Sequence, residues 1–411
     1  MNDNVELPAL ELDVNQDSPE NAVQQLIEYA ATIGASDLFL VNNETHVAIQ
    51  VRHLGLLRLV GLISSEHGRR CMAHIKATAG LDVAERRRPQ DGRWIYERPT
   101  GDLIDLRINI IPTLYGEDFT LRLLDRNTRL LKLEQLGLLR HDYNQLLGML
   151  NNPSGLILVT GPTGSGKTTT LYACLSYLNN GERKINTIED PIEYALGGVR
   201  QSQINLKLDV DFPDLLRGVL RQAPDVIMIG EVRDPLTAET AVRAANSGHL
   251  VLATLHAPVA AGAIQSMLSL GVHPHFLASS LLGALAQRLV RTLCPDCRMP
   301  IDISDAPHTF DEVRRWLEPG EGRQLFAHQG CPACFRTGYR ARTGVFEVLT
   351  VSPALRKLIL ERQPIQVLRQ KAVEEGLIEF RQSALLKVAR GETTFEEVFR
   401  AVPSEYLGVE E

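Results

Sequence analysis

Hydrophobic residues in the first third of the chain are spaced first as in a helix and then as in strands. Between Ser18, which can cap a helix, and Gly34, which can end one, apolar residues recur every three or four positions. Residues 19–126 are predicted to form a small α+β domain with largely antiparallel strands. The stretches that carry this prediction are strand-like at 38–41, 46–51, 54–61, 94–97, 103–110 and 119–124, and helical at 69–79.

The second half of the chain alternates apolar strands with helices. A buried strand is predicted at 156–159, and others lie in the stretches INTIED, VIMIGE and LVLATLH, with helices between them at 212–221 and 236–247. Such alternation predicts an α/β core in which helices wrap a parallel sheet. The predicted parts are an acidic flexible lead-in at 1–18, the small domain at 19–126, a linker and helix at 127–149, the core at 150–293, a cysteine-bearing element at 294–340 and a C-terminal helical unit at 341–411.

Length and charge narrow the class of protein. A chain of 411 residues exceeds the usual size of one domain, so two or three domains are predicted. No run of about 18 apolar residues occurs and the N-terminus lacks a signal pattern, which predicts a cytosolic protein that does not span a bilayer. The net charge of −7 is carried largely by the N-terminal segment, since no lysine or arginine precedes Arg52. The near-neutral remainder argues against nucleic acid as the main partner.

The stretch GLILVTGPTGSGKTTTLY carries the clearest chemistry. Its loop satisfies G-x-x-x-x-G-K-[ST] between a predicted strand and a predicted helix. Glycines let backbone N–H groups approach phosphate oxygens, and the helix N-terminus adds unpaired N–H groups and a positive dipole end. Lys167 can reach the β- and γ-phosphates, and the Thr168 hydroxyl can ligate Mg²⁺. The sequence therefore predicts an ATP-type triphosphate site built from Gly161, Pro162, Thr163, Gly164, Ser165, Gly166, Lys167, Thr168 and Thr169.

Acidic residues lie at the ends of two other predicted strands. VIMIGE places Glu231 where phosphate-loop enzymes put a carboxylate near Mg²⁺. IEDPIEY gathers Glu189, Asp190 and Glu193, and one of these carboxylates could hold the water that attacks a γ-phosphate. A solvated acidic loop is the alternative interpretation of this cluster.

Two histidines bracket the strand LVLATL. His249 precedes the strand and His256 follows it. Beside a phosphate site, such side chains could hydrogen-bond the γ-phosphate or the acids. Ordinary core or surface histidines are the alternative.

Four of the six cysteines form two C-x-x-C pairs. Cys294 with Cys297, and Cys331 with Cys334, have the spacing of a tetrahedral thiolate zinc site. Four thiolates leave no open ligand position, so a Zn²⁺ ion here would be structural and would clip a loop to the core. Redox disulfides are the alternative.

Four motifs in the same order reveal a family resemblance. GPTGSGKTTTLY, TIEDPIEY, LRQAPDVIMIGEVRD and GHLVLATLH resemble the Walker A, Asp-box, Walker B and His-box motifs of the secretion ATPases, the hexameric motors of type II secretion and type IV pilus machines. The likeness covers roughly residues 20–400 and implies a RecA-like core. It implies that Glu193 is the general base that orients water and that Glu231 acts through Mg²⁺. It also implies that His256 senses the γ-phosphate, with His249 nearby.

The resemblance also implies a role for arginines. RRRPQDGRW and DLRINIIPTLYGEDFTLRLLDR are similar to the family's arginine-bearing segment, which closes over the nucleotide. Arg93 and Arg107 match its positions, with Arg122 a weaker candidate. On the core, Arg217 and Arg221 lie four residues apart on one predicted helix face and could also be aimed at the γ-phosphate.

The resemblance implies a cytosolic, Mg-ATP-hydrolysing motor that works as a ring of six copies and drives pseudopilin or pilin polymerisation. Its partners would be copies of itself and platform or anchoring proteins of the inner membrane, with only peripheral membrane association through them and no nucleic acid. GspE- and PilB-type members carry the four cysteines, whereas retraction motors typically lack them. This favours secretion or pilus assembly.

Three alternatives to an assembly motor stay open. A pilus retraction motor would be favoured if no zinc were bound. A non-hydrolysing ring component that binds ATP as an assembly switch would lack catalytic acids, whereas Glu193 and Glu231 are present. A nucleic-acid translocase is disfavoured by the absence of a basic arm.

The chain departs from the family pattern in three places. Phe39 stands where a histidine is usual, and Ala257 with Pro258 replaces a Thr-Asn-acid turn. The chain also begins almost at the arginine-bearing domain. Docking on a membrane partner would therefore use the acidic first segment or another surface.

Overall fold

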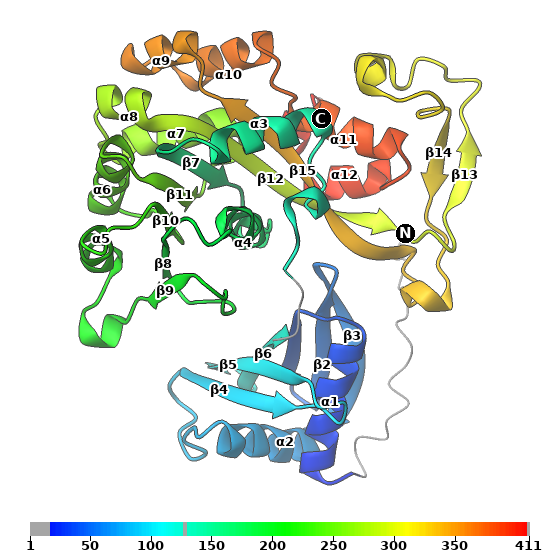
Figure 1. Cartoon of the computed structure of the whole chain (residues 1–411). Helices are drawn as coiled ribbons and strands as arrows, with labels where there is room; N and C mark the ends of the chain where they lie inside the picture. Colours follow the sequence, from blue (N-terminus) through cyan, green and yellow to red (C-terminus); the bar gives the residue numbers. More distant parts are fainter. Residues whose placement is uncertain (1–16, 126–129, 409–411) are drawn as a thin grey trace. The chain divides into compact units, whose positions relative to one another are not determined.

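The computed structural model describes residues 17–125 and 130–408, which form two compact units (Figure 1). Unit 1 holds the described residues up to 125, together with Leu293–Met299 and His328–Ala341. Unit 2 holds Leu130–Thr292, Pro300–Ala327 and the described residues from Arg342 onward. Nearly all of the predicted lead-in at 1–18 lies outside the described residues, as does the start of the predicted linker.

Unit 1 is built on one antiparallel sheet with the strand order β3-β2-β1-β6-β5-β4. The α1 helix begins where the Ser18 hydroxyl accepts from the Asn21 N–H at 3.2 Å, as the sequence predicts. Helices α1 and α2 cover one face of the sheet, and the core between them holds residues such as Leu26, Ile75 and Leu106. The predicted α+β domain with antiparallel strands is confirmed. Its elements are α1 Pro19–Thr32, β1 Asp37–Asn42, β2 His46–His53, β3 Leu56–Ser64, α2 Ser65–Thr78, β4 Gln90–Glu97, β5 Leu103–Thr113 and β6 Gly116–Asp125.

Unit 2 contains a seven-stranded sheet with the order β15-β12-β7-β11-β10-β8-β9. The ladders from β12 to β9 are parallel, which confirms the predicted α/β core. Strand β15 runs antiparallel to β12, because Val351 donates to Leu282 at one end and Cys294 donates to Gly338 at the other. The strands are β7 Gly155–Thr160, β8 Ile185–Glu189, β9 Arg200–Gln203, β10 Val226–Ile229, β11 Leu250–Leu255, β12 Leu281–Leu293 and β15 Tyr339–Thr350.

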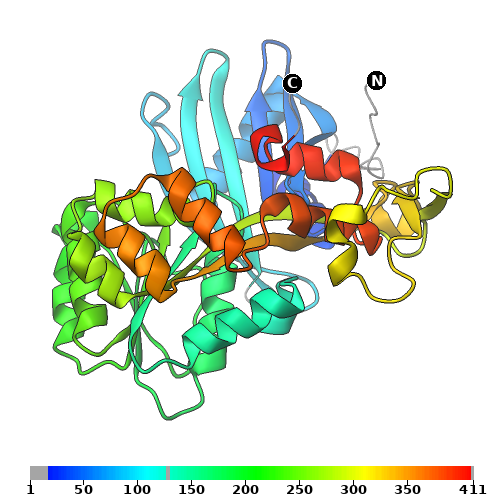
Figure 2. The same ribbon diagram turned by 90° about the horizontal axis from the view of Figure 1, so that it is seen from above.

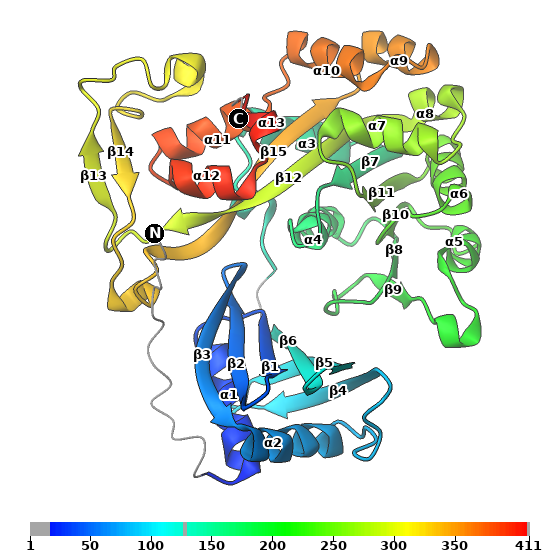
Figure 3. The same cartoon turned by 180° about the vertical axis from the view of Figure 1, so that it is seen from behind.

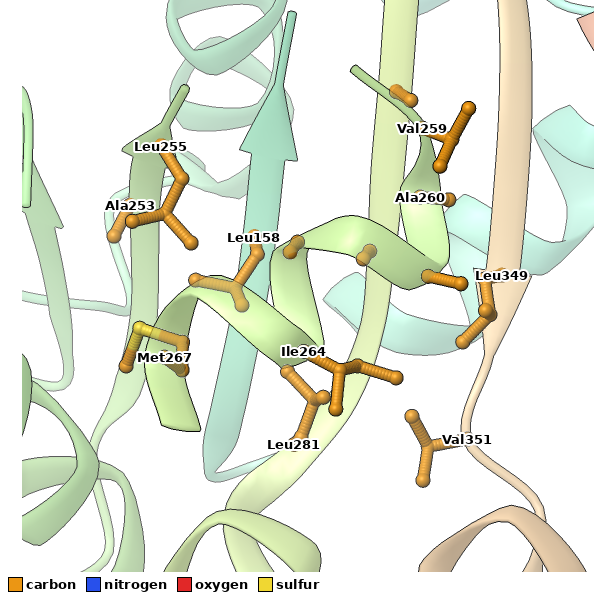
Figure 4. Packing of buried hydrophobic residues seen from close by; sticks show 14 of the residues in the cluster. Leu158, Ala253, Leu255, Val259, Ala260, Ile264, Met267, Leu281, Leu349 and Val351 are labelled. Carbon is orange, nitrogen blue, oxygen red and sulfur yellow. The ribbon is translucent and has the colours of Figure 1, made fainter. Parts of the chain in front are cut away.

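Alternate residues of the central strands pack on opposite faces of this sheet. Leu158 of β7 joins the core formed with α5–α8 and the C-terminal helices, and Figure 4 shows it near Met267 of α7. Val159 instead joins the core formed with α3 and α4. The helices on these faces are α3 Arg140–Leu150, α4 Lys167–Leu178, α5 Phe212–Leu220, α6 Pro235–Asn246, α7 Ala260–Ser269 and α8 Pro274–Ser280.

The C-terminal helices follow β15, and α11 and α12 lie beside the long strands β12 and β15 (Figure 3). The Phe346 N–H of β15 donates to the Ser383 hydroxyl of α11 at 3.3 Å, and the Thr393 hydroxyl donates to the Arg291 carbonyl of β12 at 2.8 Å. The predicted helix-rich tail is confirmed from residue 353 onward. Its helices are α9 Pro353–Leu360, α10 Ile365–Glu374, α11 Phe380–Ala389, α12 Phe395–Ala401 and α13 Ser404–Leu407.

Two predicted segments need correction. Residues 341–350, assigned to the C-terminal helical unit, continue strand β15, and the buried run at 344–349 carries no period that separates strand from helix. The segment 294–340, predicted only as a cysteine-bearing element, also includes the strand pair β13 Met299–Asp302 and β14 Gln324–Ala327, drawn in yellow and gold in Figure 2. Strands β9 and β12 were also missed. Across 17–125 and 130–408, no helix combines the length and the apolar character that crossing a membrane requires.

Candidate phosphate-binding site and metal centre

The glycine-bearing loop joins β7 to α4 at the carboxyl edge of the unit 2 sheet. Gly161 has a φ of 148°, and a Cβ at this position would lie 2.6 Å from the Gln287 carbonyl oxygen, so the loop requires glycine here. Gly166, with a φ of 88°, is the N-cap of α4, and no side chain of the described residues caps this helix. The first N–H groups of α4 are therefore left for a ligand, which is the arrangement that binds phosphate.

Lys167 lies over the same loop. Its Nζ donates to the carbonyl oxygens of Gly161 at 2.9 Å and Pro162 at 3.1 Å. Burial lowers the pKa of Lys167, the negative charge of Glu231 raises it, and the positive charge of Arg288 lowers it again. Lys167, Glu231 and Arg288 are thus near enough to interact electrostatically at the loop.

Glu231 follows β10 and lies at the same edge as the loop. His256 Nε2 is 2.8 Å from Glu231 Oε1, and the Arg233 guanidinium donates to Oε2 and lies 4.0 Å from the Asp190 carboxylate. Burial raises the pKa of Glu231, but the hydrogen bonds and positive charges of Arg233 and His256 outweigh burial and lower it below its ordinary value. The carboxylate is therefore ionised at neutral pH and is a suitable ligand for Mg²⁺.

Thr160 holds the His256 segment beside the loop. The Thr160 hydroxyl donates to the Ala257 carbonyl oxygen at 2.8 Å and accepts from the Ala257 N–H at 2.6 Å. Thr160 is the last residue of β7, so these bonds join the start of the phosphate loop to the residues after β11. The structure thus brings Lys167, Glu231 and His256 together at one edge, as the strand ends predict.

Two residues of β12 brace this edge, and sequence reasoning missed both. Gln287 Nε2 donates to the Ser165 carbonyl oxygen at 2.6 Å, and Gln287 Oε1 accepts from the Thr170 hydroxyl at 2.8 Å. Arg288 donates to the Pro258 carbonyl oxygen at 3.0 Å. No phosphate motif contains these residues, and they reach the loop only because β12 pairs with β7.

The acidic cluster at the end of β8 separates into a buried and a more accessible carboxylate. Glu189 is 2% exposed and accepts from the hydroxyls of Tyr172 and Thr187. Glu193, four residues further on, is half-buried. Of these two, Glu193 has the access that a water-orienting carboxylate needs.

Three residues predicted to contact the nucleotide have other surroundings within one chain. His249 lies at the amino end of β11, about 20 Å from the end that carries His256 at about 3.3 Å per strand residue, and its Nδ1 bonds the Ala244 carbonyl oxygen. Arg217 pairs with Asp214 on its own helix at 2.5 Å. Arg221 ends α5 as the chain returns to the amino edge of the sheet, where the Asp225 carboxylate accepts from the Lys184 N–H at 2.7 Å.

The arginines predicted to close over the nucleotide lie in one row across the unit 1 sheet. Cross-strand register pairs Arg93 with Arg107, and Arg107 with Arg122. The same row continues through Asp37 to Arg52. Directly paired residues point to the same face of a sheet. The row therefore displays four guanidinium groups on one face, and Arg52 is a member that sequence reasoning missed.

Two buried carboxylates hold this row. The Arg93 guanidinium donates to Asp105 through Nε at 2.8 Å and through Nη2 at 2.5 Å. Asp37 accepts from Arg122 Nε at 3.1 Å and lies 3.5 Å from Arg52 Nε. Asp37 and Asp105 are each only 4% exposed, so they anchor the guanidinium groups from beneath while the arginine side chains stay partly exposed.

The four paired cysteines form one cluster in unit 1. Their Sγ atoms all lie within 4.8 Å of one another. The Sγ–Sγ distances include 3.9 Å for Cys294 with Cys331, 3.8 Å for Cys297 with Cys334 and 3.7 Å for Cys331 with Cys334. Four sulfurs at the Zn–S bond length of about 2.3 Å in a tetrahedron lie about 3.8 Å apart, so the cluster fits Zn²⁺.

Backbone N–H groups surround the same sulfurs. Gly330 donates to Cys297 Sγ at 3.3 Å, and Cys331 and Gly338 each donate to Cys334 Sγ at 3.2 Å. Such donors stabilise thiolates, which are the form that binds metal. The cluster therefore has both the geometry and the surrounding groups of a structural metal site.

Comparison with known proteins gives one family. The model of the family described as type II/IV secretion system protein matches residues 13–400. The type II secretion system protein E of Dickeya dadantii is 44% identical over 395 residues, which are 96% of this chain and 78% of that protein. The type II secretion system ATPase E of Vibrio cholerae is 42% identical over 399 residues, with the same coverage of 96% and 78%.

Two solved structures have a fold similar to that of this chain. The pilus retraction motor PilT with bound ADP is 26% identical with a TM-score of 0.56, over 88% of this chain and 96% of that one. The Legionella pneumophila ATPase DotB has a TM-score of 0.70 over 96% of this chain and 98% of that one. At 21% identity, the likeness to DotB concerns the fold alone.

Proposed function

This chain belongs to the type II/IV secretion system protein family, and from that premise we propose that it is an ATP-hydrolysing motor of a secretion or pilus machine. One observation carries the proposal: Lys167, Glu231 and His256 meet at the carboxyl edge of the sheet, beside a loop that is built for phosphate. The relatives that match at 42–44% identity are named for type II secretion, and one of them is named an ATPase.

We propose specific roles for the residues at this edge. The N–H groups of the loop and Lys167 would bind the β- and γ-phosphates, and Thr168 and Glu231 would hold Mg²⁺. When bound, Mg²⁺ neutralises charge that develops on the phosphate oxygens. His256, linked to Glu231 at 2.8 Å, would report the presence of the γ-phosphate. Glu193 would orient the attacking water.

A Glu193→Gln variant tests the hydrolytic step. It is expected to bind ATP but to hydrolyse it about 100-fold or more slowly, because an amide cannot accept the proton of the attacking water. The measurements are phosphate release under saturating ATP and equilibrium binding of a fluorescent ATP analogue. Glu182→Gln, an exposed change in the loop between α4 and β8, is the matched control and should retain wild-type turnover. Turnover of the Glu193→Gln variant within a few-fold of wild type would remove Glu193 from this role.

We propose that the arginine row of unit 1 supplies further positive charge to the nucleotide. Arg93 and Arg107 are the members assigned to this role by the family resemblance, and Arg122 shares their row. Cations that meet the γ-phosphate only when the two units close would couple hydrolysis to relative motion of the units. The two buried carboxylates beneath the row support this role, because they hold the cations in place before a ligand arrives.

We propose that the cysteine cluster binds one structural Zn²⁺. Protein purified under reducing, chelator-free conditions is expected to contain about one zinc per chain. A Cys297→Ser, Cys331→Ser double variant should contain none, whereas Cys71→Ala and Cys174→Ala, which change cysteines outside the cluster, should keep the metal. Wild-type protein that contains no zinc would exclude the metal site and would favour the retraction-motor alternative.

We also propose how the motor is assembled. The chain would work as a homohexameric ring in the cytoplasm, held at the inner membrane through a platform or anchoring protein. A ring would allow ATP-driven closure of the two units in one subunit to be passed to its neighbour. Pseudopilus or pilus assembly is favoured over retraction because the four cysteines are present and clustered.

A further inference from the structure

Glu189 is a buried carboxylate that receives hydrogen bonds from three different elements of unit 2. The Tyr172 hydroxyl of α4 donates to Oε2. The Thr187 hydroxyl of β8 donates to Oε1 at 2.6 Å, and Gln201 Nε2 of β9 donates to the same oxygen at 3.0 Å. With 2% of its surface exposed, Glu189 is not accessible to a substrate. Its place therefore points to a role in arranging other groups.

The donors to Glu189 also hold the segment that carries Glu193, residues 190–196. Gln201 Nε2 lies 3.1 Å from the Tyr194 carbonyl oxygen, and Gln201 Oε1 accepts from the Leu196 N–H at 2.7 Å. The Glu193 N–H lies 3.4 Å from the Tyr172 hydroxyl oxygen. The backbone on both sides of the Glu193 side chain is thus bonded to the partners of Glu189.

The same contacts reach the phosphate loop through α4. The rings of Tyr172 and Tyr194 meet edge to face, with centroids 4.9 Å apart. The helix that begins at the phosphate loop is therefore joined to the Glu193 segment by a ring contact and by buried polar contacts. Such fully bonded networks are rigid because each missing partner leaves a buried polar group unsatisfied.

We propose that Glu189 is a positioning residue, which holds the Glu193 segment at a fixed distance from the phosphate loop through Tyr172 and Gln201. This inference rests on the proposed function, because it assumes that Glu193 orients the attacking water. Water in line with a γ-phosphate requires placement within a fraction of an ångström, and a misplacement of about 1 Å costs on the order of 100-fold in rate. The network supplies that placement without touching the substrate.

Two variants test the proposal by changing one polar group of the network each. Tyr172→Phe removes only the hydroxyl, and Glu189→Gln keeps the shape of the side chain but replaces one acceptor with a donor. Each is expected to lower kcat for ATP hydrolysis by about 10- to 100-fold. The dissociation constant of a non-hydrolysable ATP analogue should change by less than about 2-fold, because the phosphate loop itself is intact. Ser383→Ala is the matched control, since it removes a buried hydroxyl of unit 2 that bonds Phe346 on β15, and it should leave kcat unchanged.

A double variant separates this proposal from the proposed function. In a Glu193→Gln background, Tyr172→Phe should cause no further loss of kcat, because the group that it positions is already gone. If Glu193→Gln slows hydrolysis but folded Tyr172→Phe and Glu189→Gln both turn over at wild-type rates, the positioning role is excluded and the proposed function stands. If Tyr172→Phe lowers kcat equally with and without Glu193, the network acts on another group and the proposal is likewise overturned. If the Glu193→Gln variant itself retains wild-type activity, Glu193 is not the group that orients the water. The positioning role, which depends on that assignment, is then excluded with it.

Discussion

Lys167→Ala is expected to reduce ATP turnover to the background rate, a loss of at least about 100-fold, which is the scale found when one group that stabilises transition-state charge is removed. Lys167 is the cation of the phosphate loop, and its Nζ already lies over the loop, within 2.9 Å of the Gly161 carbonyl oxygen. An alanine leaves the backbone N–H groups of the loop but removes the charge that faces the β- and γ-phosphates. The measurement is phosphate release at saturating Mg-ATP, together with binding of a fluorescent ATP analogue.

Lys184→Ala is the matched control for this loss. Lys184 lies at the amino edge of the same sheet, where its Nζ donates to the Gln222 carbonyl oxygen, away from the phosphate loop. Its removal deletes a charge of the same kind and should leave turnover unchanged. Unchanged ATP turnover in the Lys167→Ala variant would contradict the central assignment of this site.

Motifs of consecutive residues could be read from the sequence because their chemistry is local. The loop from Gly161 to Thr168 carries its own backbone geometry, its cation and its helix N-terminus within a few positions. Glu231 and His256 could also be brought together, since parallel strands end at the same edge of a sheet. From their spacing, His249 and His256 were equally good candidates for the phosphate site. In the structure they lie at opposite ends of β11, so only one of them is at the edge that carries the loop.

Residues that depend on strand order and register could not be predicted in the same way. Arg52 and Arg93 are far apart in the sequence, and only the pairing across the antiparallel strands of unit 1 places them in one row. Gln287 reaches the phosphate loop only because β12 lies beside β7. The sequence could not show which acid at the end of β8 is buried, because the burial of Glu189 follows from Tyr172 and Gln201, on two other elements.

Asp142 carries a buried carboxyl group that the proposed function does not use. It lies in the first turn of α3, it is fully buried, and neither carboxylate oxygen receives a hydrogen bond from any residue that the structure describes. Burial raises the pKa of its carboxyl from 3.8 to about 7. A buried carboxyl without partners favours the protonated form, so the folded chain binds this proton more tightly than the unfolded chain does.

Stability should therefore fall with rising pH because of Asp142. Between about pH 4 and pH 7 the unfolded chain releases the proton while the folded chain retains it, so the free energy of unfolding decreases and then stays low above pH 7. An asparagine side chain cannot ionise, so Asp142→Asn should match wild type near pH 4 and be more stable at pH 8. The gain should be up to about 4 kcal/mol, from about three pKa units at 1.36 kcal/mol each.

The decisive measurement is how the difference in the free energy of unfolding between Asp142→Asn and wild type changes with pH. Contributions from all other titrating groups cancel in this difference. The chain has two tryptophans, of which Trp94 lies in unit 1 and Trp316 in unit 2 with α3. In a Trp94→Phe background, Trp316 fluorescence follows the urea unfolding of unit 2. Asp305→Asn, an exposed change in the same unit, should give a difference from wild type that does not vary with pH. If the difference for Asp142→Asn were equally constant from pH 4 to pH 8, Asp142 would be ionised in the folded chain throughout, and α3 would have to supply it with a partner.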